Sequence, residues 1–443
     1  MMISTWRKRK TERMVAKRGL MEDITSMELV IPRHYTCPIS LDLMKDPVTL
    51  STGITYDREN IEKWIEAGNQ TCPITNQTLR NIGEPIPNHS IRKMIQQWCV
   101  ENKDHGIERI PTPRIPVTSS EVVELLAKIS KEMHDSEVCK ELVSKVKKLV
   151  NESERNKRCF VTNGTAHVLS AAFVAFSEEI NMKNSSTGEV ILSTLTTILP
   201  LDGESKSNLG SISSLCCMVW FLNNGSLSCR RNAVFLLKDI LKMEEHDKVE
   251  ILLGIEGALE GLVKLVKEPI CPTTTKASLL AIYHMVNSSH SSSFANKKAQ
   301  SRFADVGLVE LLVEMLVDCE KSICEKALGV LDGICSSIEG RKRAYSYALT
   351  VPVLVKKLLR VSDLATEFSV SILWKIGKRE NGGDVLVEAL KLGAFQKLLL
   401  LLQVGCSETT KEKASELLKL LNVHRDRAEC VDSLDFKSLK RPF

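Results

Sequence analysis

The strongest constraint on this chain is a segment pattern that returns along most of its length. Each unit has a glycine, a short apolar helix and then a second helix carrying a small residue. The clearest copies begin Gly257-Ala-Leu-Glu-Gly-Leu-Val, Gly307-Leu-Val-Glu-Leu-Leu-Val and Gly393-Ala-Phe-Gln-Lys-Leu-Leu. Their alanines Ala277, Ala327 and Ala414 follow 20, 20 and 21 residues later. Because a helix pair cannot bury its apolar face alone, such copies must stack on one another.

Weaker copies begin near residues 164, 213 and 350, so successive starts are 43 to 50 residues apart. This period is typical of helical repeats of the armadillo or HEAT type. Ser/Asn-rich insertions such as residues 287–296 lengthen some intervals, and we expect them to be loops. Only 5% of the residues are aromatic, which also favours helices over a β-sandwich or barrel. The sequence predicts a mainly α fold ending in an α-solenoid, with a non-repetitive helical domain as the alternative.

The formal net charge of +5 is a property of the N-terminal tail. Residues 1–20 hold seven basic groups and one acid, and the remaining chain has 53 basic and 54 acidic residues. The body therefore has no charge excess that would attract phosphate, which argues against a nucleic-acid-binding solenoid. We predict that residues 1–30 form a basic, disordered arm, with a nuclear-import signal as the sharper alternative.

Other broad classes are excluded by composition. No run approaches the roughly 18 apolar residues that a membrane span needs, and no apolar h-region follows the basic N-terminus. The chain has 14 cysteines in 443 residues, a far lower density than in a disulfide scaffold. We therefore expect reduced thiols and a cytoplasmic location, with the nucleus as a second location.

A proline-containing linker divides the chain. Residues 108–116 read E-R-I-P-T-P-R-I-P, and their prolines remove hydrogen-bond donors and favour extended backbone. We place the linker at residues 106–120. A small α+β module occupies residues 31–105 before it, helical repeats occupy residues 121–425 after it, and residues 426–443 form a tail.

The module is expected to contain a hairpin and two helices. Two short strands are predicted within residues 48–56, around Gly53. Asp57 is the expected N-cap of the first helix, and Asn88 that of the second. Apolar spacing gives the first helix a core side at Ile61, Trp64 and Ile65, and the second a core side at Ile91, Met94, Ile95 and Trp98.

Two Cys-Pro-Ile motifs, at Cys37 and Cys72, are the candidate functional features. A zinc site needs four ligands in close pairs. His34 lies three residues before Cys37, but Cys72 has no such neighbour and neither motif has a second Cys, so we expect no metal. No His or Asp motif surrounds either thiol, which argues against a nucleophile. The remaining interpretation is a docking surface made of Ile39, Leu41, Trp64 and Pro73. Core filling by Trp64 and ordinary loop packing of the others are the alternatives.

These residues resemble a known family. The stretch Ile31-Pro-Arg-His-Tyr-Thr-Cys-Pro-Ile-Ser-Leu-Asp-Leu-Met-Lys-Asp-Pro-Val, followed by Gly53-Ile-Thr-Tyr-Asp-Arg-Glu-Asn-Ile-Glu-Lys-Trp-Ile, is similar to the U-box of plant ubiquitin ligases. The helical repeats resemble those of the plant U-box/armadillo class. The resemblance implies a RING-like fold held by polar contacts instead of zinc. Its structural residues in this chain are Cys37, Asp42, Asp46, Asp57, Cys72 and Asn88.

The resemblance also implies an E3 ubiquitin-protein ligase that forms no covalent intermediate with ubiquitin. A ubiquitin-charged conjugating enzyme (E2) is the co-substrate, and no cofactor is implied. The implied E2-binding residues are Ile39, Leu41, Trp64 and Pro73. Asn76 departs from the family, because several U-boxes have a basic residue there that steadies the E2–ubiquitin thioester.

Substrate recognition is assigned by the resemblance to the repeats. Armadillo proteins that grip extended peptides often use an asparagine ladder on their inner helices. Only Asn232 has such a place here, and Lys276, Lys326 and Lys413 replace it in other copies. We therefore expect another mode of protein binding. The rival function is a scaffold or adaptor whose U-box is inactive.

Overall fold

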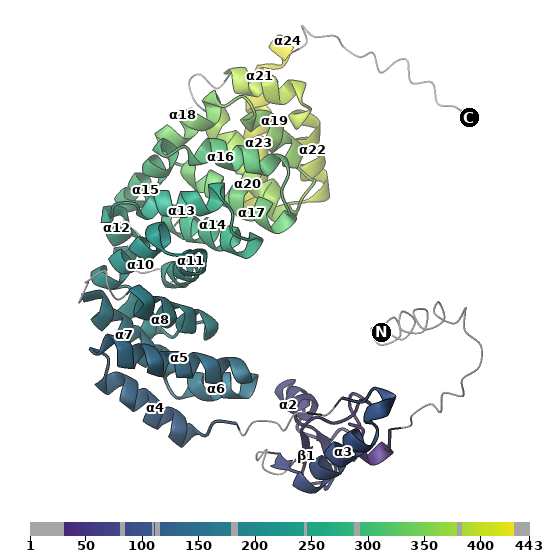
Figure 1. Ribbon diagram of the computed structural model, residues 1–443. Helices are drawn as coiled ribbons and strands as arrows, with labels where there is room; N and C mark the ends of the chain where they lie inside the picture. The colour runs from purple at the N-terminus through teal and green to yellow at the C-terminus, as the bar shows by residue number, and fades with distance from the viewer. Residues whose placement is uncertain are drawn as a thin grey trace, which may run out of the picture. The chain divides into compact units, whose positions relative to one another are not determined.

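A computed structural model describes residues 31–79, 85–108, 110, 116–178, 185–242, 246–287, 293–378 and 383–428. The chain divides into two compact units, residues 1–115 and 116–443 (Figure 1). The predicted basic arm lies outside the described residues, as do residues 109 and 111–115 of the predicted linker and the tail from residue 429 onward.

Unit 1 is built on a small antiparallel sheet of order β2-β1-β3. Its strands are β1 Pro47–Thr49, β2 Thr55–Asp57 and β3 Ile86–Pro87, and Val48 pairs with both Tyr56 and Pro87. Gly53 has a φ of 78° in the turn between β1 and β2, a conformation that glycine adopts without strain. The predicted hairpin is confirmed. The remaining elements are η1 Arg33–Tyr35, α2 Arg58–Glu66, α3 His89–Glu101 and η2 Lys103–His105.

The core of unit 1 lies between the sheet and the two helices. Its fully buried side chains include Met44, Val48, Tyr56, Ile61 and Ile95. One prediction about this core is wrong. Met94 is 46% exposed, because the buried side of α3 is centred on Ile95 and Cys99, and Met94 lies at the edge of the apolar stripe.

Unit 2 is a helical solenoid whose long helices form a continuous row in which each packs against the next. We call this the inner row: α5 Ser136–Glu152, α8 Ser185–Thr197, α11 Leu227–Leu241, α14 Pro272–Val286, α17 Lys321–Ile334, α20 Asp363–Gly377 and α23 Glu408–Val423 (Figure 1). The helix before each of them is α4 Ser119–Lys131, α7 Thr165–Glu178, α10 Ile212–Asn224, α13 Ala258–Lys267, α16 Leu308–Val317, α19 Thr350–Lys357 or α22 Ala394–Val404. Each of these helices packs on the inner-row helix that follows it, and α4 packs on α7, α7 on α10 and α10 on α13 as well.

Most repeats contain a third helix, whereas the sequence pattern predicted two helices in each unit. Short helices precede the expected pairs: α9 Gly203–Leu209, α12 His246–Gly254, α15 Ser293–Asp305, α18 Ile338–Ser346 and α21 Gly383–Lys391, with α6 Glu154–Thr162 and α24 Arg425–Ala428 at the ends. The prediction of a loop over residues 287–296 is wrong from Ser293 onward. Helix α15 begins there because Ala295, Ala299 and Phe303 continue a buried stripe at four-residue spacing.

Glycines set the start of several repeats. Gly164, Gly257, Gly307 and Gly393 all have φ between 79° and 83°, the left-handed region, immediately before an apolar helix. A residue with a Cβ is strained in this conformation, which explains why the predicted unit begins with glycine. The weaker copies near residues 213 and 350 differ locally, since Ser211 caps α10 through its side chain and Leu349 precedes α19 in a right-handed conformation.

Within the described residues, no single helix has the length and apolar character needed to cross a membrane, and only the bent pair of α6 and α7 passes that test when taken together.

Candidate functional site

Two loops of unit 1 have the same backbone construction. In the first, the amide of Leu41 donates to the carbonyl of Cys37 at 2.8 Å, and the amide of Cys37 donates to Asp42 at 2.8 Å. In the second, the amide of Asn76 donates to the carbonyl of Cys72 at 2.9 Å. Leu41 and Asn76 occupy equivalent places, with φ of 61° and 54°. Left-handed backbone is costly for leucine and tolerated by asparagine, so both loops are held in a defined shape by the surrounding contacts.

The cysteines anchor these loops from inside. Both thiols are fully buried. The sulfur of Cys37 accepts from the amide of Asp57 at 3.3 Å and from Nδ2 of Asn60 at 3.6 Å. Among the described residues, no group of three or more His, Cys, Asp or Glu side chains is placed to hold a metal ion. The Cys-Pro-Ile motif thus places its cysteine in the core and its isoleucine at the surface.

The thiol of Cys72 has an unusual environment. Its sulfur accepts from the hydroxyl of Thr52 at 3.4 Å and shares a hydrogen bond with the hydroxyl of Tyr56 at 3.0 Å. Burial opposes ionisation, but the hydrogen bonds from Thr52, Thr75 and Tyr56 outweigh it and lower the pKa of Cys72 to about 6. The second loop is therefore tied to the hairpin through sulfur.

The outer surface of the two loops presents apolar side chains. Ile39 is 36% exposed and Leu41 is 69% exposed, while Pro73 is half-buried. Trp64 of α2 is also half-buried, and its indole Nε1 donates to the carbonyl of Thr71 at 2.8 Å, which joins α2 to the start of the second loop. We call Ile39, Leu41, Trp64, Pro73 and the residue described next the loop patch.

Sequence reasoning missed one member of the loop patch. Ile74 is 55% exposed and is the second-loop equivalent of Ile39. The repetition of Cys-Pro-Ile at residues 37–39 and 72–74 was the available signal, since equal loops present equal positions to solvent. Asn76 is also exposed on the second loop. Its left-handed backbone is a physical reason for asparagine at this position.

A buried polar network lies behind the first loop. The carboxylate of Asp46 pairs with Nε of Arg58 at 2.8 Å and with Nη2 of Arg92 on α3. Asp57 precedes α2, as predicted for an N-cap, but its side chain makes no capping bond. Instead its Oδ1 accepts from the amides of Lys45 at 2.9 Å and Asp46 at 2.7 Å. Burial raises the pKa of Asp57, although these two amide bonds oppose the shift.

Asn88 joins the second helix to the sheet. Its Oδ1 accepts from the amide of Ile91, so it caps α3 as predicted. Its Nδ2 donates to the hydroxyls of Thr49 at 3.1 Å and Thr55 at 3.4 Å, on β1 and β2. Asp42, a predicted member of the same scaffold, is exposed, and the contacts described for it are made by its backbone.

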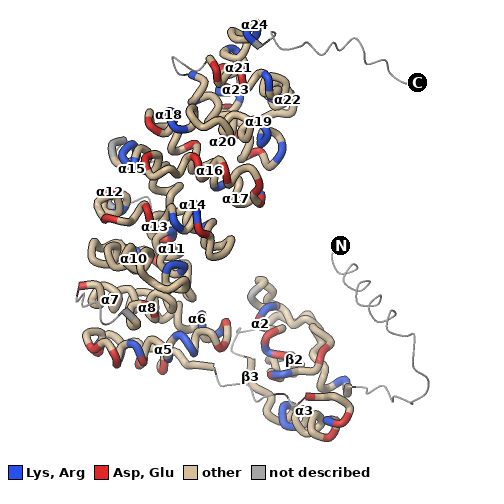
Figure 2. The backbone as a smooth tube through the Cα atoms, turned by 45° about the horizontal axis from the view of Figure 1, so that its top comes forward, with Lys and Arg blue, Asp and Glu red and all other residues tan. Residues whose placement is uncertain are grey.

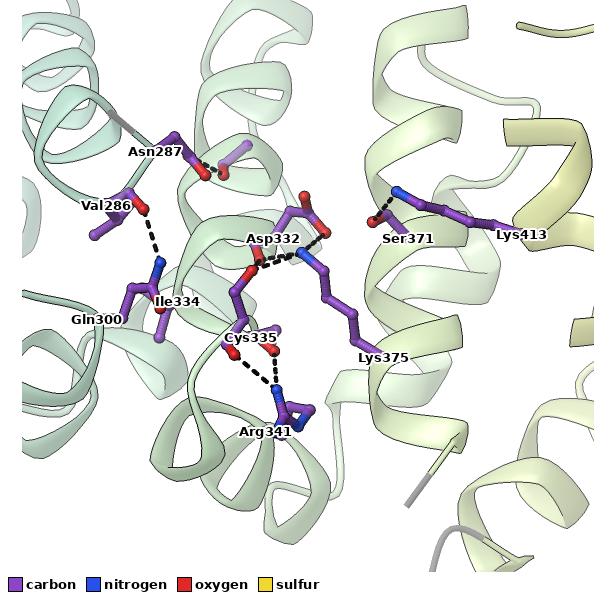
Figure 3. Close-up of polar contacts among 12 residues, drawn as sticks. Val286, Asn287, Gln300, Asp332, Ile334, Cys335, Arg341, Ser371, Lys375 and Lys413 are labelled. Carbon is purple, nitrogen blue, oxygen red and sulfur yellow. Dashed lines mark hydrogen bonds and ion pairs between the residues drawn. The ribbon is translucent and has the colours of Figure 1, made fainter. Parts of the chain in front are cut away.

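Polar side chains connect the inner row of unit 2 (Figure 3). Nζ of Lys375 on α20 donates to the carbonyl of Asp332 on α17 at 2.7 Å and pairs with its carboxylate at 2.8 Å. Nζ of Lys413 on α23 donates to Ser371 on α20 at 2.9 Å, and Asn287 donates to the carbonyl of Gly329 at 3.3 Å. Each contact spans 42 or 43 residues, so it links one repeat to the next.

The residues at the positions compared with an asparagine ladder are Asn232, Lys276, Lys326 and Lys413. Asn232 on α11 is buried. Nζ of Lys276 pairs with Glu320 at 3.0 Å, and Nζ of Lys326 bonds to Ser322 within its own helix. The two lysine side chains therefore serve contacts within the chain.

A small α+β module followed by a solenoid of helical repeats defines a class of protein, and comparison with known proteins shows which family this is. The U-box domain family matches residues 31–104, and the plant U-box protein ARM repeat region matches residues 121–441. The chain belongs to the plant U-box family with armadillo repeats. U-box domains are RING-like and need no metal.

Individual relatives cover nearly the whole chain. U-box domain-containing protein 21 of Arabidopsis thaliana is 45% identical over 444 residues, covering 99% of each chain. E3 ubiquitin-protein ligase PUB23 of the same plant is 34% identical over 408 residues, covering 91% of this chain and 94% of that protein. The solved structure of Uso1-2 superposes with a TM-score of 0.52 at 11% identity, over 70% of this chain and 52% of that one, which is a likeness of fold alone.

Proposed function

We propose that this protein is an E3 ubiquitin-protein ligase whose U-box docks a ubiquitin-charged E2. The observation that carries the proposal is the loop patch, in which two rigid loops and α2 hold apolar side chains at the surface of a domain that matches the U-box. Exposed apolar groups on a small rigid module are typical of a docking site. The similarity to E3 ubiquitin-protein ligase PUB23 supports the same function.

The proposed reaction transfers ubiquitin directly from the E2 thioester to a lysine amine of the substrate. The amine attacks the thioester carbonyl, the E2 thiolate leaves, and an isopeptide bond forms. Cys37, Cys72 and Cys99 of unit 1 are buried, which supports a route with no ubiquitin–ligase thioester in this unit. The ligase contributes by holding E2 and substrate together, and well-oriented reactants gain large rate factors from proximity alone.

Asn76 bears on how well the bound thioester is oriented. An uncharged amide offers a neutral hydrogen bond, whereas a basic side chain would offer a charge-assisted one of roughly twice the strength. We propose that transfer depends strongly on which E2 is used, because the E2 must supply part of this orientation itself.

The decisive experiment is single-turnover discharge of a ubiquitin-charged E2 onto free lysine, with a panel of E2 enzymes. Truncating an apolar anchor at an interface costs about 1–3 kcal/mol, so Ile39→Ala and Ile74→Ala should each slow discharge about 5- to 150-fold. Ile86→Ala is the matched control, since Ile86 is 68% exposed on β3, outside the loop patch, and should discharge at the unaltered rate.

The scaffold alternative predicts a different outcome. If the unaltered chain stimulates no E2 of the panel, or if Ile39→Ala and Ile74→Ala both match Ile86→Ala, the loop patch does not dock E2. Far-UV circular dichroism of each variant separates a docking defect from a folding defect.

A further inference from the structure

Helix α11 has a stripe of two cations and two apolar side chains, in which Leu227 and Arg231 are exposed and Phe235 and Lys238 are half-buried. Leu227, Arg231, Phe235 and Lys238 follow one another at intervals of four, four and three residues, so they lie along one side of the helix. The guanidinium of Arg231 lies 5.4 Å from the centre of the Phe235 ring, and Nζ of Lys238 lies 5.5 Å from it. Figure 2 colours the Lys and Arg residues of the backbone blue, including those of α11. Two like charges are therefore gathered at one aromatic ring.

A cavity of about 350 Å³ begins where this stripe starts. Leu227 lines it together with Leu222, Leu265 and Ile270, which form an apolar part. Arg230, Lys264 and Glu268 line it as well, and Leu227 is itself 63% exposed. Nε of Arg230 donates to the carbonyl of Gly225 at 2.9 Å, which fixes the guanidinium at the cavity.

The charges of this region are not balanced from within the chain. In the part of the chain that the structure describes, no carboxylate forms an ion pair with Arg230, Arg231, Lys238 or Lys264. Two acids close to α11 have other partners. Asp239 pairs with Lys206 at 3.5 Å, and Glu189 of α8 is hydrogen-bonded to the thiol of Cys229.

Lysines on and beside two other inner-row helices, α14 and α20, have acidic partners. Lys276, Lys375 and Lys378 pair with Glu320, Asp332 and Glu416 at 3.0, 2.8 and 2.9 Å. Helix α11 is thus set apart from α14 and α20, whose lysines are neutralised by neighbouring repeats.

We propose that the stripe and the cavity together bind a short acidic peptide segment with an apolar side chain, presented by a substrate protein. The apolar side chain enters the cavity beside Leu222 and Leu265. Carboxylates of the peptide pair with Arg230 and Lys264 at the cavity and with Arg231 and Lys238 farther along. From Leu227 to Lys238 the helix rises about 16 Å, which matches about five residues of extended peptide. This inference names the substrate class and rests on the proposed ligase function.

A nucleic acid is the other polyanion that a cationic stripe might attract, but the observations favour a peptide. The cavity has an apolar part suited to an aliphatic side chain, and four cations with one acid give a modest local excess. Outside residues 1–20 the chain has 53 basic and 54 acidic residues, so the body has no net positive charge that would attract a phosphate backbone.

The test uses the full chain and fluorescence anisotropy with a fluorescein-labelled decapeptide of alternating Glu and Leu. A second decapeptide has Gln in place of Glu. The acidic peptide should bind at least tenfold more tightly than the Gln peptide, and its affinity should fall as salt is raised. Arg231→Glu and Lys238→Glu should each weaken binding tenfold or more, and Leu227→Asp should do so through the cavity.

Lys148→Glu is the matched control, because Lys148 is an exposed lysine on α5 and its reversal changes the net charge equally. It should leave the dissociation constant within twofold. Equal losses in Lys148→Glu and Arg231→Glu would show a mere effect of net charge and overturn the site. So would equal affinity for both peptides, no binding of either, or tighter binding of a single-stranded RNA decamer.

This measurement is independent of the U-box. Peptide binding with no E2 discharge would leave the site standing and overturn the ligase proposal. E2 discharge with no peptide binding would leave the ligase proposal standing and overturn the peptide site. Thermal melts of each variant show whether a loss of binding comes from unfolding.

Discussion

Asp57 shows how one side chain takes a role that local sequence does not reveal. It stands where an N-cap is expected, yet its carboxylate accepts two amide bonds from the chain at Lys45 and Asp46. These bonds tie the entry of β1 to the start of α2. We predict that Asp57→Ala destabilises unit 1 by about 2–4 kcal/mol, because two amides lose their acceptor and each unsatisfied buried group costs about 1–3 kcal/mol.

Asp57→Asn keeps one oxygen acceptor and should cost less than half as much. Hydrogen exchange at the amides of Lys45 and Asp46 measures the effect directly. Equal exchange rates in the alanine variant and the unaltered protein would contradict this role.

The lowered pKa of Cys72 leads us to predict how the stability of unit 1 changes with pH. Its pKa in the folded protein is about 6, below the ordinary value of 9.0. Between pH 6 and 9 the unfolded thiol therefore holds more protons than the folded one, so the free energy of unfolding should rise with pH across this window. The gain is at most about 4 kcal/mol, because one pKa unit corresponds to about 1.4 kcal/mol.

Urea unfolding of the full chain at pH 6, 7.5 and 9 tests this prediction. Cys72→Ser should flatten the rise, since serine does not titrate in this range. A parallel rise in the serine variant would assign the pH dependence to other groups.

At the scale of elements, sequence patterns correctly predicted those elements that are determined by local burial or by a capping residue. The hairpin at Gly53, the cap at Asn88 and the glycine-led helices of the repeats follow from local chemistry, and the structure has them. The short third helices were not predicted, because segments such as α18 are polar and gain their stability from packing against neighbouring repeats.

The candidate site was partly predictable for the same reason. The exposed positions Ile39 and Leu41 were identified from a motif, but the left-handed backbone of Leu41 was not, since leucine rarely adopts it. The exposure of Asp42 and Met94 was also not predicted from the sequence. It depends on where the chain turns and on which edge of α3 meets the sheet, and spacing along the sequence does not contain that information.

Close packing between inner-row helices leads to a prediction about Gly333 on α17. A Cβ at this position would lie 2.6 Å from Val286 and 2.7 Å from the side-chain amide of Asn287. Alanine favours a helix by about 1 kcal/mol, but overpacking costs about 1–3 kcal/mol. We predict that Gly333→Ala lowers the stability of unit 2 by about 1–2 kcal/mol in a thermal melt.

Gly254 provides the matched control. It ends α12, and a Cβ there meets nothing within 4 Å. Gly254→Ala should leave the melting temperature unchanged or raise it. Equal melting temperatures for the two variants would mean that the contact between α14 and α17 is more compliant than its geometry indicates.

At the scale of the whole molecule, the described residues form two separate cores, one in each unit. We predict two unfolding transitions in calorimetry. Phe303 is fully buried in unit 2, and Phe303→Ala should cost about 3–5 kcal/mol there while the transition of unit 1 stays in place. A single transition that shifts as a whole would show that the units unfold together.

Removal of metal ions should have no effect on either unit. Unit 1 is held by the ion pairs of Asp46 and by hydrogen bonds to the sulfurs of Cys37 and Cys72, and these contacts need no metal. Dialysis against EDTA should leave both melting temperatures and the rate of E2 discharge unchanged. A loss of either that zinc restores would contradict this account.

The inner row of unit 2 has a mechanical consequence. Each helix of the row packs on its neighbours, and some neighbours are also joined by single polar bridges such as Lys375 to Asp332 and Lys413 to Ser371. Such junctions act like springs in series, and the compliance of springs in series adds. A small rotation at each junction therefore sums to a large displacement between the ends of the row, while no single contact is broken. The solenoid is stiff over one repeat and elastic over many.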